Sequence, residues 1–339
     1  MTQRNCDQSP AAVAGHRRGF VVATATLAAL PLWSRAQQPN KVWRVGVLLP
    51  YPQPAVPNPN NPFQLGLREL GYVEGKNLEL QYRFADNRLE RLPVLATELV
   101  QLRVDAIFAV GTPAVRAAQA ATRQIRIVLL VGDPVVSGLV ASLARPGGNT
   151  TGVSNLEFDA VPKRLELLLA VAPKAAKIGV LVNPANAANM QTLTYAQPVA
   201  QRVGVGLVAA EAQKAAEIPN AFAYMVQQGV GALLVGADTL FFAESPQISE
   251  LAIRHRLPAL GGNPEFPVAG GLMSYAPSTA EQSRLAANYV DRIFKGAKPA
   301  DLPVQQPTAF QLVINMKTAK AIGLTVPQAV LLRATRLIE

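Results

Sequence analysis

Cysteine and histidine are scarce in this sequence. Its 339 residues include one cysteine, Cys6, and two histidines, His16 and His255. A disulfide needs two cysteines, and a thiolate nucleophile or a cysteine-ligated metal needs a cysteine within the folded domain. Cys6 and His16 stand in a leader-like segment, and His255 lies between two arginines near the end of an expected helix. We therefore expect no disulfide, no thiolate chemistry and no catalytic histidine.

Recognisable catalytic motifs are also absent. The sequence has no Gly-x-Ser-x-Gly elbow, no Walker loop, no dinucleotide-binding fingerprint and no His/Cys/Asp cluster with metal-ligand spacing. Gly147-Gly148-Asn149 is rich in glycine, but it does not stand between a buried strand and a helix as a phosphate cradle would. These absences favour a binding protein over an enzyme and predict neither a metal nor a cofactor.

Aromatic residues are few, at 6% of the chain, and they do not alternate with Lys and Arg. The net charge of +10 is spread along the sequence rather than gathered in one block. A nucleic-acid groove needs basic and aromatic side chains together. We therefore expect no nucleic acid partner and interpret the charge as a solvated basic surface.

A continuous apolar run long enough to cross a membrane is missing, but a shorter one stands near the start. Arg17-Arg18-Gly19-Phe20 precedes the apolar residues Val21–Leu32, and Ser34-Arg35-Ala36 supplies the small residues of a cleavage site. The sequence predicts that residues 1–36 are a signal peptide, cleaved near Ala36, and that residues 37–43 are a linker.

The arginine pair followed by Gly-Phe resembles the twin-arginine export signal of bacteria. His16 stands where the consensus has Ser or Thr, and Val21 stands where it has Leu. Export by the Sec route therefore stays open, and either route predicts a periplasmic protein.

The stretch Val104–Gly148 organises the expected fold. It holds two copies of one unit: an apolar run rich in β-branched residues, a small polar loop and a helical pattern. The runs Ala106–Val110 and Ile127–Val131 end in Gly111-Thr112-Pro113 and Gly132-Asp133-Pro134. Apolar runs of this length, separated by a helix, predict parallel strands that are buried on both faces.

Chain length and an internal echo predict two lobes. Arg44–Leu49, RVGVLL, begins one series of strands and helices, and Lys177–Val182, KIGVLV, begins a second. We predict an α/β protein with two Rossmann-like doubly wound lobes joined by a hinge, and a helical end to the chain after Asn315. The expected boundaries are 44–155 plus about 279–308 for lobe 1, and 156–278 plus about 309–339 for lobe 2.

Candidate binding residues follow from this fold, because ligands of open α/β sheets bind where the carboxyl ends of strands run into loops. We expect five such residues to face one cleft: Tyr51, Thr112, Asp133, Asn183 and Asp238. The hydroxyl of Thr112 and the free amides of a helix start suit a ligand carboxylate. An acidic side chain, Asp133 or Asp238, suits a ligand ammonium group.

Structural roles compete with these assignments. Thr112-Pro113 and Asp133-Pro134 are favourable pairs for a helix start, so both side chains could cap the backbone. Asp238 before Thr239 could cap in the same way, and Tyr51 could be a surface aromatic of a proline-rich loop. The sequence leaves both interpretations open.

Three longer runs carry a resemblance to a known family: Leu67–Asn77 (LRELGYVEGKN), Gly132-Asp133-Pro134 with Leu143–Asn149 (LARPGGN), and Gly270–Tyr275 (GGLMSY). They resemble the ABC transporter substrate-binding proteins related to the tryptophan- and tyrosine-binding components. The resemblance extends from about Val45 to the carboxyl end. It implies a type I periplasmic-binding fold, no catalytic activity, and delivery of a small solute to a membrane permease.

The resemblance also implies that Thr112, Asp133, Asn183 and Asp238 belong to loops that line the cleft. Gly132 precedes Asp133 where the aromatic-amino-acid binders often have Thr, and Asn183–Asn186 replaces a loop richer in hydroxyl and acidic groups.

We therefore expect a monomeric periplasmic receptor that closes on a small, carboxylate-bearing or zwitterionic solute, such as an amino acid, and presents it to an ABC permease. A sensory binding module and an enzyme on the same scaffold are the alternatives.

Overall fold

In a computed structural model, residues 41–55, 61–155 and 158–339 are described. The predicted signal peptide and most of the predicted linker lie outside these residues, so both stay predictions. None of the helices within the described ranges is long and apolar enough to span a membrane.

Lobe 1 is built on a sheet in the order β2-β1-β3-β4-β5, in which all neighbouring strands are parallel. The strands are β1 (Trp43–Leu49), β2 (Leu78–Phe84), β3 (Ala106–Val110), β4 (Arg126–Val131) and β5 (Thr150–Ser154). The helices are α1 (Pro62–Glu69), α2 (Leu92–Gln101), α3 (Thr112–Ala121) and α9 (Thr279–Phe294), and α2 follows a 3₁₀ turn, η1 (Leu89–Arg91).

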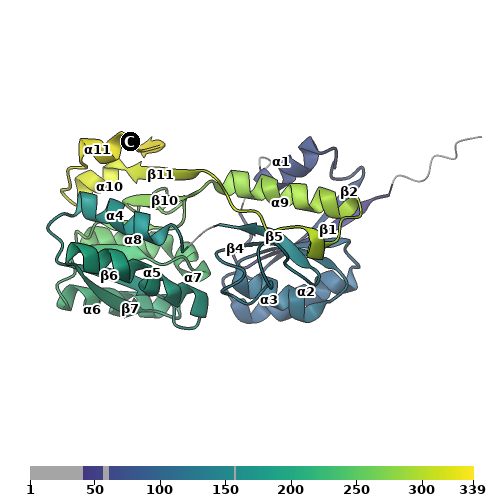
Figure 1. The fold of residues 1–339 in the computed structure, drawn as a ribbon, viewed down its shortest axis with the longest axis horizontal. Coiled ribbons are helices and arrows are strands. Elements are labelled where there is room, and N and C mark those ends of the chain that lie inside the picture. The colour runs from purple at the N-terminus through teal and green to yellow at the C-terminus, as the bar shows by residue number, and fades with distance from the viewer. Residues whose placement is uncertain (1–40, 56–60, 156–157) are drawn as a thin grey trace, which may run out of the picture. The chain divides into compact units, whose positions relative to one another are not determined.

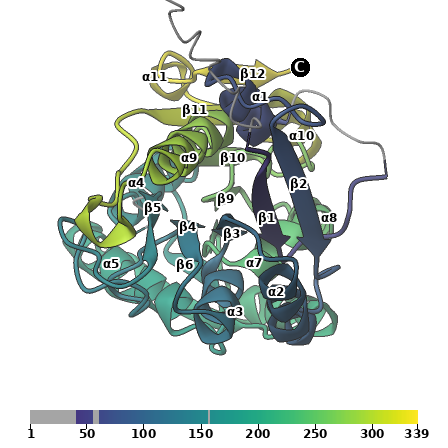
Figure 2. The same cartoon turned by 90° about the vertical axis from the view of Figure 1, so that its right-hand side faces the viewer.

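Helices cover both faces of the lobe 1 sheet, as Figure 2 shows. On one face α1 packs against α9, and their apolar side chains enclose Val45, Val47 and Phe108 of the strands. On the other face α2 packs against α3 over Leu48, Ile107 and other strand residues. The central strands are thus buried on both sides, which explains their continuous apolar sequence.

Lobe 2 is built on a longer sheet in the order β12-β11-β10-β9-β8-β6-β7. Its strands are β6 (Lys177–Val182), β7 (Gly206–Glu211), β8 (Ala232–Val235), β9 (Ala259–Gly261), β10 (Met273–Pro277), β11 (Phe310–Asn315) and β12 (Arg336–Ile338). Its helices are α4 (Val161–Val171), α5 (Ala187–Val203), α6 (Ile218–Gln227), α7 (Thr239–Ala243), α8 (Ser245–Arg254), α10 (Met316–Ala321) and α11 (Gln328–Leu331). Short 3₁₀ turns are η2 (Ala215–Glu217) and, beside β5 of lobe 1, η3 (Pro299–Asp301).

Two separate apolar clusters stabilise the lobe 2 sheet, one on each face. Residues of α4, α5, α10 and α11 pack with Val180 and Leu234 on one face. Residues of α6 and α8 pack with Leu181, Leu233 and Phe241 on the other. Several helices carry a proline in their first two positions, where its missing N–H removes no helical hydrogen bond: α1, α2, α3, α4, α6 and α8.

The two lobes repeat one arrangement. Five strands of lobe 2, in the order β7-β6-β8-β9-β10, have the same order in the sheet relative to the chain as β2-β1-β3-β4-β5 in lobe 1. The first strand of each lobe, β1 and β6, carries a glycine at the equivalent place. An added Cβ would lie too close to a helix side chain there: 2.9 Å from Leu99 at Gly46 and 2.4 Å from Met225 at Gly179. The echo between RVGVLL and KIGVLV thus corresponds to two strands on which a helix side chain packs directly.

Three chain segments connect the lobes (Figure 1). The first follows Ser154 of β5 and leads to α4. The second is Ser278, between β10 of lobe 2 and α9, which packs on β3, β4 and β5 of lobe 1. The third follows Gln305, which is bridged to Val153 of β5, and leads to β11.

Two sequence expectations for secondary structure are wrong. No helix follows Pro134, because residues 134–138 form a turn in which the Leu139 N–H donates to the Pro134 carbonyl and the Gly138 N–H donates to that of Val135. This pattern closes a helix after one turn. It lets Leu139 and Val140 fold back into the lobe 1 core.

The end of the chain is not wholly helical either. After α10 and α11 the chain forms β12, which pairs in parallel with β11 through Val313–Asn315. Moreover, β11 runs antiparallel to β10, so this end of the lobe 2 sheet is mixed.

Gly152 is required by the close pairing of β5 with β4. Its φ is +146°, and an added Cβ would lie 2.2 Å from the Leu129 carbonyl oxygen. We expect Gly152→Ala to lower the free energy of unfolding by about 2 to 4 kcal/mol, through backbone strain and overpacking. Urea denaturation measures the change. Gly206→Ala in β7, where the new Cβ would lie 3.5 Å from its nearest neighbour, is the control, and equal losses in both variants would contradict the explanation.

Candidate functional site

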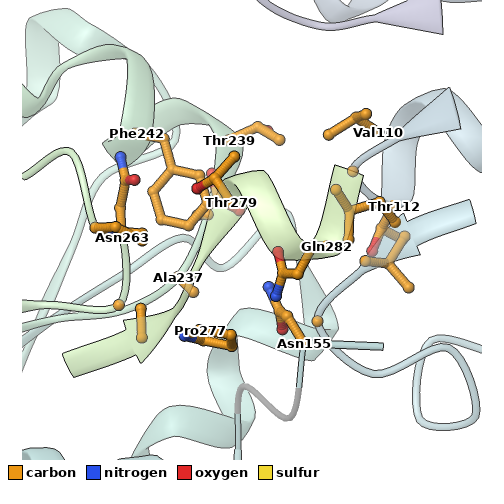
Figure 3. A pocket seen from close by; sticks show the side chains of 18 of the residues that line it. Val110, Thr112, Asn155, Ala237, Thr239, Phe242, Asn263, Pro277, Thr279 and Gln282 are labelled. Atoms are coloured by element: carbon orange, nitrogen blue, oxygen red, sulfur yellow. The ribbon is translucent and has the colours of Figure 1, made fainter. Parts of the chain in front are cut away.

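A pocket of about 360 Å³ opens where loops from both lobes meet, within the usual size range of small-molecule sites. It lies at the carboxyl ends of β3 and β4 in lobe 1 and of β8 and β9 in lobe 2, and the start of α9 forms another wall (Figure 3). Its walls include the side chains of Tyr51, Val110, Thr112, Leu130, Val131, Asn155, Asn186, Asp238, Thr239, Phe242, Asn263, Glu265, Thr279 and Gln282.

Asp238 is the acidic group that the structure holds most firmly in this wall. It is 4% exposed, and its Oδ1 accepts hydrogen bonds from the Leu240 N–H (2.9 Å) and from Asn183 Nδ2 (3.1 Å). Its Oδ2 accepts one from Asn186 Nδ2 (2.7 Å). Asp238 therefore caps α7, as the structural alternative predicted, and it lines the pocket as well. Because a carboxylate oxygen can accept two hydrogen bonds, Oδ2 keeps capacity for a further donor.

Thr112 lies at the start of α3 and faces the pocket from lobe 1. The N-cap is Gly111, and no side chain caps this helix. The capping interpretation of Thr112 is therefore wrong. Its hydroxyl stands beside the free amides of a ten-residue helix, where the helix dipole favours negative charge.

The lobes approach each other closely beside Thr112. A Cβ on Gly111 would lie 2.9 Å from the methyl carbon of Thr239, the first residue of α7 in lobe 2. Glycine at position 111 thus allows loops of opposite lobes to touch at the pocket.

Tyr51 lines the same pocket from the loop after β1. Burial, with a smaller contribution from the negative charge of Asp238, raises the pKa of Tyr51 from 10.0 to about 12. The phenol therefore stays protonated across the physiological range and offers the pocket both a hydroxyl and an aromatic face.

Asp133 and Asn183 do not line the pocket. Asp133 Oδ1 accepts hydrogen bonds from the N–H groups of Val135 (2.9 Å) and Val136 (3.0 Å), so its side chain caps the turn after β4. Asn183 is 6% exposed and holds Asp238, while its own Oδ1 accepts from the Ala185 N–H. Asn183 thus supports the site from behind its wall.

Sequence reasoning missed Asn155, Thr279 and Gln282. Asn155 follows β5, and the other two lie in the first turn of α9. The signal available was their position, because all three stand where the chain crosses from one expected lobe to the other.

Among the described residues that line the pocket, the charged side chains are Asp238 and Glu265, and none is Lys or Arg. A ligand carboxylate would therefore be received by backbone amides and neutral side chains, and a cationic group by carboxylates. Among the described residues, no group of three or more His, Cys, Asp or Glu side chains could hold a metal ion.

Comparison with known proteins gives the family. Residues 44–338 match the family model described as ABC transporter substrate binding protein. This chain belongs to that family. Proteins of this kind bind small-molecule solutes and work with ABC transporter permeases.

Individual relatives agree with the family. The chain is 27% identical over 286 residues to a tyrosine-binding protein of Clostridioides difficile (strain R20291), covering 84% of this chain and 82% of that protein. A conserved domain protein of Vibrio cholerae is 30% identical with a TM-score of 0.81, over 88% of this chain and 100% of that one. An ABC domain from Streptococcus pneumonia in complex with L-Trp is 25% identical with a TM-score of 0.77, over 87% and 100%.

These comparisons and the two α/β lobes confirm the predicted two-lobed, type I periplasmic-binding fold. Members of the family are solute-binding proteins.

The raised pKa of Tyr51 predicts a stability change in alkaline solution. Above pH 10 the unfolded phenol loses its proton while the folded phenol keeps it until about pH 12, so the free energy of unfolding falls as the pH rises through this range. Tyr51→Phe should make that fall less steep, as measured by urea denaturation between pH 10 and pH 12. Tyr224→Phe, at a side chain that is 46% exposed, is the control, and parallel curves for Tyr51→Phe and the wild type would refute the prediction.

Proposed function

We propose that this protein is the periplasmic solute-binding component of an ABC-type importer and that it closes by hinge motion on a small carboxylate-bearing solute, an amino acid. The observation that carries the proposal is the pocket itself, in which Asp238 of lobe 2 and the helix start at Thr112 of lobe 1 line one cavity. These two features suit the ammonium and carboxylate groups of one zwitterion.

The rest of the lining suits an apolar ligand body. Tyr51 and Phe242 provide aromatic surface, and Val110, Leu130 and Val131 provide aliphatic surface. The tyrosine-binding relative and the neighbour with L-Trp support an amino acid with an aromatic or branched side chain as ligand.

Closure follows from the way in which the lobes are connected. Three segments join them, and the ligand touches loops of both lobes, so rotation about these segments brings the loops together. Gly111 and Thr239 permit close approach at the pocket. The permease then recognises the closed form, whose population the ligand raises.

Export and assembly complete the proposal. The signal peptide over residues 1–36 would place the mature chain in the periplasm, where receptors of ABC importers act. The partners are the solute and an inner-membrane ABC permease, and the receptor is a monomer.

A ligand screen tests this function. The mature chain from Gln37 is unfolded, refolded to remove any retained ligand, and screened by thermal shift against amino acids, short carboxylates, nucleosides and sugars. We expect aromatic or branched amino acids to raise the unfolding midpoint, because a ligand that binds only the native state stabilises it. Small-angle scattering of the responding complex should show a smaller radius of gyration. If no amino acid raises the unfolding midpoint of the folded protein, the proposed ligand class is wrong.

Asp238→Asn tests the ammonium site. This variant keeps an oxygen for the Leu240 N–H but removes the charge and the acceptor of the Asn186 Nδ2 hydrogen bond, so we expect binding to weaken by about 2 to 4 kcal/mol. Asp238→Ala should lower the free energy of unfolding as well, since it also removes the cap of α7. Calorimetric titration and urea denaturation separate the two effects. Asp133→Asn, in a cap outside the pocket lining, should leave affinity unchanged.

A further inference from the structure

Glu265 is the second carboxylate of the pocket wall, and its oxygens are accessible. The residue lies in the loop between β9 and β10, lines the pocket from lobe 2 and is exposed. Among the described residues, its carboxylate has neither a hydrogen-bond donor nor an ion-pair partner. Asp238, by contrast, is 4% exposed and already accepts three hydrogen bonds. A ligand can therefore reach the Glu265 oxygens without displacing a protein group.

The backbone of Glu265 is held on both sides. Asn263 Oδ1 accepts a hydrogen bond from the Glu265 N–H (3.1 Å), and the Glu265 carbonyl accepts one from the Ala269 N–H (3.0 Å). The next residue, Phe266, is 1% exposed and packs in an apolar cluster of lobe 2. The loop therefore presents the Glu265 side chain at a defined place of the pocket wall.

The surroundings of Glu265 suit the side chain of a ligand rather than its charged head group. Pro264 and Phe242 line the same part of lobe 2 with apolar surface, and none of the described lining residues is a Lys or Arg that could neutralise Glu265. Figure 3 shows Phe242 and Asn263 on the opposite side of the pocket from Thr112. A ligand whose carboxylate lies at Thr112 would therefore extend its side chain toward Phe242 and Glu265.

We propose that Glu265 determines the ligand specificity of the pocket: its carboxylate accepts a hydrogen bond from a donor at the end of the solute's side chain. The inference rests on the proposed function and narrows its ligand class to amino acids whose apolar side chain ends in an O–H or N–H group. A phenol hydroxyl or an indole N–H is a neutral source of this donor, and an ammonium group is a cationic one.

The same contact excludes amino acids that lack the donor. A wholly apolar side chain of similar size would cover the Glu265 oxygens and remove their water without replacing its hydrogen bonds. Sites built to bond a polar ligand group reject the analogue without that group for this reason. Asp238 and Glu265 thus have separate tasks, with Asp238 for the ammonium group that all amino acids share and Glu265 for the end of the side chain.

Three matched pairs of probes test the proposal by calorimetric titration into the refolded mature chain. L-tyrosine and L-phenylalanine differ by a phenol hydroxyl, L-tryptophan and its N-methylated indole analogue differ by an N–H, and L-lysine and L-norleucine differ by an ammonium group. We expect the wild-type protein to bind the donor-bearing member of at least one pair about tenfold or more tightly than its partner.

Glu265→Met keeps the length of the side chain and removes both oxygens. We expect it to abolish the difference within that pair by weakening the donor-bearing member, while the unfolding midpoint of the ligand-free protein stays unchanged, since the carboxylate has no partner among the described residues. Glu265→Gln distinguishes the two sources, because it keeps a neutral acceptor. A preference for a phenol or an indole should survive in part, whereas a preference for lysine should be lost with the charge.

Glu211→Met is the matched control. Glu211 ends β7 in the same lobe, is exposed, and has no side-chain partner among the described residues, but it lies outside the pocket lining. The exchange removes the same charge from lobe 2 and should leave the affinity for each probe unchanged.

The possible failures separate the inference from the proposed function. If amino acids bind but the wild-type protein does not distinguish the members of any pair, or Glu265→Met leaves the preference unchanged, the inference is wrong and the proposed function stands. The inference is equally wrong if Glu265→Met weakens both members of a pair alike, since Glu265 then acts on the part that they share. If no amino acid binds the wild-type protein, the proposed ligand class is wrong and the inference with it.

Discussion

The parallel pairing of the central strands is the constraint on which this structure depends. Parallel neighbours need a crossover connection that returns the chain to the starting edge, so the carboxyl ends of β1, β3 and β4 open at one edge of the lobe 1 sheet. The same order recurs in β6, β8 and β9 of lobe 2. Loops from both edges meet at one pocket, and this placement brings Tyr51, Thr112 and Asp238 together from distant parts of the chain.

Within the pocket, structural and binding roles are shared unequally among polar groups. Asp238 serves the fold first, since three donors already hold its carboxylate, and it offers its remaining capacity to a ligand. Asn155 Oδ1 and Gln282 Nε2, by contrast, are buried without a hydrogen-bond partner among the described residues.

Much of the fold was predictable because local signals were strong. The runs that became β1, β3, β4 and β6 are short, apolar and bounded by Gly, Pro or Asn, which is typical of strands buried on both faces. The prediction of a helix after Pro134 was wrong. The apolar residues there belong to a turn that returns Leu139 and Val140 to the core. β12 was missed because its strand character depends on pairing with β11, which sequence periodicity does not report. The lobe boundaries stay a prediction.

By itself the sequence determined the α/β class, the repeat of two lobes and the loops that bear Tyr51, Thr112 and Asp238, since burial on both faces leaves a pattern in the chain. Only the tertiary structure decided which polar groups serve the fold and which face the pocket. It assigned Asp133 to a cap and Asn183 to the support of Asp238, and it left Asn155 Oδ1 and Gln282 Nε2 without a hydrogen-bond partner among the described residues. The physical reason is that hydrogen-bond satisfaction depends on neighbours distant in sequence, and no local pattern records them.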